Sequence, residues 1–526
     1  MSAPKVMFLG LDAFDPGIAR QLAAGGVLPN IRTLFQRGGS ARVINPVGLY
    51  VGALWVTFAT GQRADKHGFH CWLEVSPETY EHNFTKPPQM TNPFWHRLGD
   101  QGRRVAVVDV PHSRIEGPVN GIQTVEWGSH DRHFGFTTWP PMLGPDIESQ
   151  FGLHPILGID AHDVREFAPD DYVLREGKYR TPDEDRGMAA GLAAGASTKA
   201  QISRHLLKLE SWDLFLAVFG ESHSIGHQQW HLHDPTHPRY DAKAREATGG
   251  DPLVKIYKEL DRGVGELLAE IEDHTVVLTL FSHGMGPHYD GSHLLDELLT
   301  RIDAFNRASQ RFAPGRALRS AVAQVPLRLR QQAVARAVPF LRHRAASQAL
   351  PSAAVYALSA QRAAQRYFME PNNTVVGGVR FNVIGRESAG LVAPDEVREL
   401  AVSLADDLQS VVNLANGRPV VKDIAMASDH FSRSPGDTMP DMFVFWDNSA
   451  SIETVWSPKT GTVHGPYDDW RTGDHRDTGL LLASGPNIPS GVLPDIALED
   501  FAPTIASLLG VSLDGVDGKS AAWSAA

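Results

Sequence analysis

The protein has 526 residues, of which 42% are hydrophobic, and a formal net charge of −12. The acidic balance argues against a general nucleic-acid binder, and the single cysteine, Cys71, excludes a disulfide framework. The length allows one large domain with insertions, or roughly two to four smaller domains.

The first apolar run, in MSAPKVMFLGLDAFDP, is interrupted at Asp12, so it is shorter than the apolar region of a secretory signal. No stretch of the chain approaches the length of a membrane span. One cysteine also fits a reducing compartment. We therefore expect a cytoplasmic protein.

Apolar runs alternate with helix-like patterns along the chain. Strands are predicted for residues 5–13, 103–111, 212–220, 275–284 and 478–485, and helices for residues 17–26, 29–39, 94–102, 198–211, 255–272 and 499–510. This alternation favours an α/β fold, with a mostly parallel sheet and helices on both faces. In such sheets, ligands bind at the carboxyl ends of the strands.

Two segments interrupt this alternation. Residues 131–195 are rich in Pro, Asp and Phe and predict a loop-rich cap, and residues 291–371 predict a basic helical insertion. We assign the α/β core to residues 1–130, 196–290 and 372–526. Within the last of these, residues 372–450 resemble a second, smaller α/β part.

The basic insertion carries ten arginines between residues 301 and 344, against a single acidic residue, Asp303. They are Arg301, Arg307, Arg311, Arg316, Arg319, Arg328, Arg330, Arg336, Arg342 and Arg344. This segment would neutralise an anionic substrate or an acidic membrane surface. Alternatively, it is an amphipathic helical insert whose arginines are solvated, or an oligomer contact.

Residues suited to metal binding lie next to the predicted strands. Asp12 and His283 end or follow such a run, and His475 precedes one. His223 and His227 are four residues apart, which on a helix puts both rings on one face and suits a zinc-like ion. Among 23 histidines, one such pair is weak evidence by itself.

With these residues in place, the chain resembles the alkaline phosphatase superfamily, specifically its type I phosphodiesterase/nucleotide pyrophosphatase branch. The resemblance covers most of the chain. It rests on GLDAFDP, LPNIRTL, LWVTFATGQRADKHGF, PFWHRLGDQGRRVAVVDVPHS, NGIQTVEWGSHD, IYKELDRGVGELL, FSHGMGP, GDHRDTGLLLASGPNI, EDFAPTIASLLGV and DGKS. It implies an alkaline-phosphatase-like fold and two divalent metal ions, often zinc or manganese.

Carried over residue by residue, the resemblance implies one metal site at His223, His227 and His475. It implies a second at Asp12, Ser282 and His283, with the nucleophile of the family at residue 51.

Three positions depart from the family pattern. Residue 51 is Val51, which can neither attack nor bind a metal; His223 and Ser282 stand where the family has aspartates. The first site thus becomes three neutral imidazoles, which suits one zinc ion with a position open for water. The second site keeps one carboxylate and one imidazole. A second divalent ion there, such as manganese, would therefore be weakly held.

Other residues near these motifs have two interpretations each. Tyr50 and Thr57 are the hydroxyls that could replace the missing nucleophile, or they pack in the core. His288 would supplement the second metal site, or it is a solvent-facing loop residue. Trp230, three residues after His227, would wall the substrate pocket or pack in the core.

The sequence therefore predicts a metal-dependent hydrolase of a small anionic molecule, such as a phosphate ester or a phosphonate, acting through metal-bound water. The alternatives are a repurposed metalloenzyme, such as a lyase or a group transferase, and a non-catalytic metal-binding homologue. We expect no nucleic-acid partner and no membrane span, and a homo-oligomer is possible.

Overall fold

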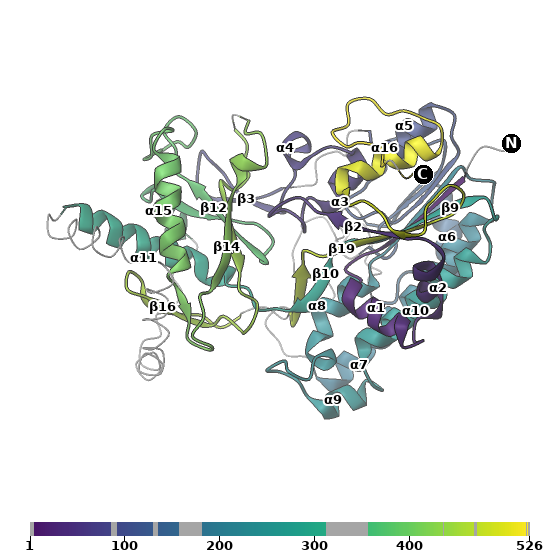
Figure 1. Ribbon diagram of the computed structural model, residues 1–526, viewed down its shortest axis with the longest axis horizontal. Coiled ribbons are helices and arrows are strands. Elements are labelled where there is room, and N and C mark those ends of the chain that lie inside the picture. The colour runs from purple at the N-terminus through teal and green to yellow at the C-terminus, as the bar shows by residue number, and fades with distance from the viewer. Residues whose placement is uncertain are drawn as a thin grey trace.

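A computed structural model describes residues 5–85, 92–129, 135–156, 181–311, 356–434, 436–467, 471–521 and 523. Figure 1 shows two lobes: a large lobe built on one extended sheet, and a smaller lobe that contains strands β12 and β14. The predicted α/β class is confirmed.

The large lobe contains a ten-stranded, mostly parallel sheet with the order β20-β2-β19-β9-β1-β8-β5-β6-β7, and β21 also pairs with β2. Strands β9, β1, β8, β5 and β6 are parallel, whereas β19 and β7 run antiparallel to their neighbours. The bounds are β1 Lys5–Leu11, β2 Gly39–Ile44, β5 Val105–Val108, β6 Gly121–Val125, β7 Thr137–Trp139, β8 Leu214–Phe219, β9 Thr275–Phe281, β19 Gly479–Ser484, β20 Gly491–Val492 and β21 Ile496–Ala497.

Helices cover both faces of this sheet because alternate side chains of its central strands point to opposite sides. In β1, Met7 and Leu9 pack on one face, whereas Val6 and Phe8 pack on the other. The first face is covered by α1 Pro16–Ala24, α2 Pro29–Arg37, α6 Leu143–Phe151, α7 Pro182–Leu207, α8 Glu221–His233 and α10 Pro252–Leu268, with α9 Ala242–Ala247 beside α7 and α8. The second face is covered by α3 Leu54–Thr60, α5 Phe94–Asp100 and α16 Phe501–Leu508.

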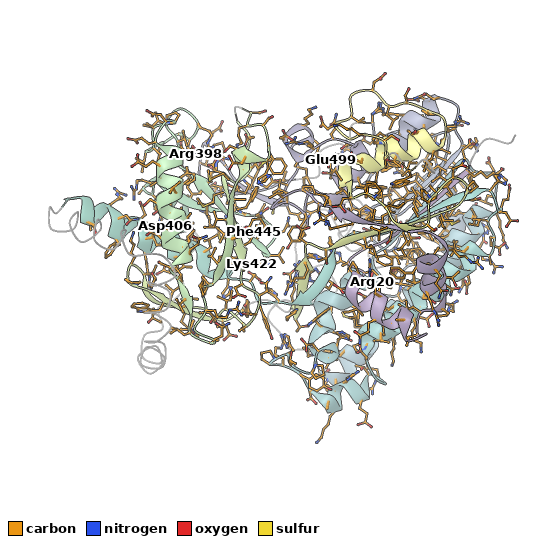
Figure 2. The ribbon with its side chains drawn as sticks, in the orientation of Figure 1. Arg20, Arg398, Asp406, Lys422, Phe445 and Glu499 are labelled. Atoms are coloured by element: carbon orange, nitrogen blue, oxygen red, sulfur yellow. The ribbon has the colours of Figure 1, made fainter. Side chains whose placement is uncertain are left out.

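The small lobe has its own sheets and core. An antiparallel sheet of order β11-β12-β15-β14 and a three-stranded sheet of order β13-β16-β17 pack with α11 and α15. The bounds are α11 Ser292–Arg311, α14 Tyr356–Ala363, β11 Tyr367–Glu370, β12 Val376–Phe381, α15 Val397–Gln409, β13 Val412–Asn413, β14 Val421–Met426, β15 Met442–Trp446, β16 Thr454–Ser457 and β17 Gly461–His464. Figure 2 labels Lys422 and Phe445 in this lobe, and Arg20 and Glu499 in the large one.

A two-stranded antiparallel ribbon follows the carboxyl end of β9. It pairs β10 Gly284–Pro287 with β18 Gly473–Arg476, and Met285 faces His475 in the register. The remaining short elements are α4 Ala64–His67, β3 Leu73–Val75, β4 His82–Phe84 and the 3₁₀ turns η2 Ala427–Asp429 and η3 Leu498–Asp500.

Strand pairing divides the chain differently from the predicted domain boundaries. Residues 372–526 were assigned to the core, but β12 to β17 pair only within the small lobe, and the chain rejoins the large sheet at β19. Residues 292–302 of the predicted insertion supply Leu294, Leu298 and Ile302 to the core of the small lobe. In the predicted cap, residues 182–195 belong to α7, which packs on the large sheet. Sequence periodicity gives the type of an element but not its strand partner.

None of the helices in the described ranges is both long enough and apolar enough to cross a bilayer.

A buried histidine, His70, lies at the junction of the lobes. His70 is 3% exposed, and its backbone carbonyl accepts a hydrogen bond from Asn373 of the small lobe. The pKa of His70 is lowered to about 3, first because the ring is buried and then because Arg380 and Arg433 are nearby. The folded protein therefore keeps this ring neutral, whereas the unfolded chain takes up a proton below about pH 6.5.

We predict that acidification to pH 5 lowers the free energy of unfolding, with His70 contributing about 2 kcal/mol of the loss. A His70→Gln variant cannot take up this proton, so its stability should fall less between pH 7 and pH 5. Urea unfolding of both proteins at the two pH values measures the difference. Equal losses in the two proteins would contradict the assignment to His70.

Candidate metal centre

Three histidines converge at the carboxyl edge of the large sheet. His223 and His227 lie on α8, which begins directly after β8, and their four-residue spacing puts both rings on one face. His475 comes from β18 of the ribbon. The Nε2 atom of His227 lies 2.7 Å from Nε2 of His223 and 3.0 Å from Nε2 of His475. We call these residues the three-histidine cluster.

The other ring nitrogens fix how the two rings on α8 are protonated. Nδ1 of His227 donates to the backbone oxygen of Gly473 at 2.8 Å, and Nδ1 of His223 donates to Oδ2 of Asp12 at 3.1 Å. Because both acceptors lack a proton, each Nδ1 carries the hydrogen and each Nε2 carries a lone pair. Two lone pairs facing each other at 2.7 Å repel unless a cation lies between them.

A proton on His475 is unfavourable. His475 is 1% exposed, and burial lowers its pKa well below the ordinary value, with His283, His227 and His223 lowering it further. Three neutral imidazole nitrogens are a ligand set that zinc binds readily. The geometry of the three-histidine cluster therefore fits the metal site that the sequence predicts there.

Asp12 has contacts that differ from those of a metal ligand. Its Oδ1 accepts hydrogen bonds from the Ser282 hydroxyl at 2.7 Å and from the indole nitrogen of Trp55 at 3.1 Å. Its Oδ2 accepts from His223. Asp12 thus orients His223 from behind, as carboxylates commonly do for metal-binding histidines. The sequence pattern gave no indication of the hydrogen bond from Trp55 to Asp12.

The residues of the predicted second set, Asp12, Ser282 and His283, lie together around Oδ1 of Asp12. The Ser282 hydroxyl donates to Asp12 and also accepts from the backbone nitrogen of Ala13 at 3.1 Å. Nε2 of His283 lies 3.8 Å from Oδ1 of Asp12, and its ring is 4.0 Å from that of His475 between centroids. The three residues lie beside the three-histidine cluster, and the side-chain oxygens of Asp12 and Ser282 accept hydrogen bonds from other groups of the protein.

Close backbone packing holds the ribbon against α8. The backbone nitrogen of Thr472 donates to the oxygen of His227 at 2.7 Å, and a Cβ atom on Gly473 would lie 2.3 Å from the oxygen of Gly226. Only glycine therefore fits at residue 473. Trp230, which was predicted either to wall the substrate pocket or to pack in the core, is 6% exposed. Its side chain packs against Gly473 and so supports the ribbon.

Burial and hydrogen bonding make the hydroxyls near residue 51 poor nucleophiles. Val51 packs against a cluster that joins Tyr50 and Ala53 to Phe443 of the small lobe. Tyr50 is buried, which raises its pKa far above the ordinary value, so a phenolate is unfavourable. Thr57 is fully buried inside α3 and is hydrogen-bonded to His67 at 3.0 Å.

His288 is buried, at 6% exposure, and faces Asp290, so the interpretation as a solvent-facing loop residue is wrong. Together with Asp474 these residues form a second group of potential metal ligands, and none of the three belongs to the set Asp12, Ser282 and His283. Sequence reasoning missed Asp290 and Asp474. The available signals were the HxD spacing of residues 288 and 290 and the aspartate just before His475.

Two arginines of the basic stretch make structural contacts in the small lobe. Arg301 donates to the backbone oxygens of Thr460 and Thr462, at 3.0 and 2.8 Å, and Arg307 donates to that of Ala364 at 2.6 Å. The stretch from Arg316 to Arg344 lies outside the described residues.

A search of curated proteins finds no match. Among solved structures, the chain is similar to murine ectonucleotide pyrophosphatase/phosphodiesterase 5, with 12% identity, a TM-score of 0.48 and coverage of 98% of this chain and 97% of that one. It is also similar to phosphonoacetate hydrolase from Sinorhizobium meliloti 1021, with 12% identity, a TM-score of 0.47 and coverage of 97% and 96%.

The profile of the type I phosphodiesterase/nucleotide pyrophosphatase family matches residues 6–467. This match spans all the predicted site residues except His475. The chain therefore belongs to the type I phosphodiesterase/nucleotide pyrophosphatase family.

Proposed function

We propose that the protein is a metal-dependent hydrolase of a small anionic molecule, such as a phosphate ester or a phosphonate, and that it uses water as the nucleophile. The observation that carries the proposal is the convergence of three imidazole Nε2 atoms, two of which have their lone pairs fixed by Nδ1 hydrogen bonds. Membership of a phosphodiesterase and pyrophosphatase family supports the substrate class.

Zinc is the metal that these residues suit best. His223, His227 and His475 supply three neutral nitrogen ligands, which matches catalytic zinc sites that keep a fourth position open. When bound, such an ion lowers the pKa of a coordinated water to about 7 and polarises an oxygen of the substrate. Three neutral ligands add no negative charge at the centre, which favours the approach of an anion.

The surrounding residues support water rather than a protein group as the nucleophile. Residue 51 has no hydroxyl, the phenol of Tyr50 is held neutral by burial, and Thr57 is bonded to His67. Ser282 is committed to Asp12 and to the backbone of Ala13. Asp12 in turn holds His223 in the tautomer whose Nε2 faces the centre.

A His227→Ala variant should lose about one zinc ion per chain relative to the wild type, because it removes the central ligand of the cluster. Elemental analysis by mass spectrometry measures this. His233→Ala is the matched control, since His233 lies on the same helix but pairs with Asp251 at 2.8 Å. Full zinc content in the His227 variant would refute the site.

Asp12→Asn should weaken zinc binding about 10–100-fold, since an amide cannot accept all three hydrogen bonds that the carboxylate accepts. Competition with a chromophoric chelator gives the affinity. Asp251→Asn, which changes the partner of His233, should leave the affinity unchanged. An unchanged affinity in the Asp12 variant would mean that this carboxylate does not orient His223.

Direct attack by water should invert the configuration at phosphorus and leave no phospho-protein. The assay screens phosphomonoesters, phosphodiesters and phosphonates with the zinc-loaded enzyme, and then follows a chiral version of the best phosphate ester. Retention of configuration, with a phosphopeptide containing Tyr50 or Thr57 after acid quench, would establish a covalent route instead.

A further inference from the structure

A second group of potential metal ligands lies beside β18. Successive side chains of a strand point to opposite sides, so the ring of His475 joins the three-histidine cluster while Asp474 extends towards Thr374 of the small lobe, with its Oδ1 3.8 Å from Nδ1 of His227. On that other side, Asp474 meets His288 and Asp290, and one ligand atom from each lies within 4.8 Å of the others. We call these three residues the carboxylate cluster. They are 1%, 6% and 3% exposed, respectively.

Asp290 is held in place through Oδ1 and through its backbone oxygen. Its Oδ1 accepts from the backbone nitrogen of Ser292 at 2.9 Å, and its own backbone oxygen accepts from the Tyr467 hydroxyl at 2.8 Å. Its Oδ2 is buried and in direct contact with Nε2 of His288. A buried carboxylate oxygen in this position is oriented towards the centre of the cluster.

Asp474 is held from both lobes. Its Oδ1 accepts from the backbone nitrogen of His475 at 2.8 Å. Its Oδ2 accepts from the Thr374 hydroxyl at 3.0 Å and lies 4.0 Å from Nε2 of His288. Thr374 belongs to the small lobe and has a φ of 48°, a left-handed conformation that is unusual for threonine. The Ser292 hydroxyl, which donates to the backbone oxygen of Thr374, helps to hold this turn.

The charges of the carboxylate cluster favour a divalent cation. Two carboxylates are buried beside one imidazole, and a protonated His288 would neutralise only one of them. Arg471 lies 3.8 Å from Oδ1 of Asp474, on the side away from His288, and its side chain is 31% exposed. A divalent ion would neutralise both carboxylates, and one nitrogen with carboxylate oxygens is a donor set that suits manganese or zinc.

We propose that the carboxylate cluster of His288, Asp290 and Asp474 binds the second divalent metal ion of this protein. This site takes the place of the second site that the sequence resemblance implies at Asp12, Ser282 and His283. Asp12 is fully engaged with Ser282, Trp55 and His223, so it has little capacity left for a cation. The two metal sites are joined by adjacent residues of β18. The inference concerns metal binding alone and does not depend on the hydrolase assignment.

Metal stoichiometry tests the second site directly. Metal-free protein is reloaded with zinc or manganese, desalted, and analysed for metal per chain. The wild type should hold about two ions, and Asp290→Asn and His227→Ala about one each, because each variant removes one ligand set. Asp477→Asn is the control: this carboxylate is nearby on the chain but bonds to Asn45, so about two ions should remain.

Two results would overturn the second site. A wild type that holds a single ion, unchanged in Asp290→Asn, would show that the carboxylate cluster is an ordinary buried ion pair. A second ion that is lost in His283→Gln but kept in Asp290→Asn would place it beside Asp12 instead.

A measurement on the wild type alone covers the case in which the Asp290 variant fails to fold. Zinc is first loaded to one equivalent, and manganese is then added. Pulsed electron paramagnetic resonance should detect bound manganese coupled to the nitrogen of one imidazole, that of His288. Absence of bound manganese, or coupling to several imidazoles, would refute the site.

Discussion

The tautomers of His223 and His227 are the constraint on which the candidate site depends. Each ring donates from Nδ1, to Asp12 and to the backbone of Gly473 respectively, and so directs a lone pair from Nε2 towards the other ring. Loss of either donor bond would free the ring to rotate or to change tautomer. The sheet contributes by bringing the ends of β1, β8 and β9 together, so that Asp12, α8 and His283 meet at one edge.

The β10–β18 ribbon extends this arrangement into the space between the lobes. It is held to α8 through the close approach at Gly473, and to the small lobe through the Thr374 hydroxyl on Asp474. The Arg476 guanidinium also donates to the backbone oxygens of His475 and Pro287, one on each strand. A short strand pair would be marginal alone, but these bonds fix the directions of His475 and Asp474.

Elements with strong periodicity were predictable from the sequence. The strand ends that carry Asp12, His223 and His283 follow from long buried apolar runs, and the pairing of His223 with His227 follows from the helical period. The ribbon was not predictable, because GMGP and GDHR are short and polar or glycine-rich and their pairing joins residues far apart in the chain. The burial of His288 and the separate sheets of the small lobe depend on the same kind of long-range pairing.

The departures from the family pattern are physically linked. At residue 282, where the resemblance places an aspartate, Ser282 donates a hydrogen bond to Asp12. A carboxylate at residue 282 would instead repel the carboxylate of Asp12. With that bond and the one from Trp55, Asp12 becomes an acceptor for Nδ1 of a ring, and residue 223 is the histidine that supplies it. A histidine at 223 therefore fits best when residue 282 is a donor. The histidine at 223 gives the first site three nitrogen ligands, and the serine at 282 supplies one of the hydrogen bonds that hold Asp12 in place behind that histidine.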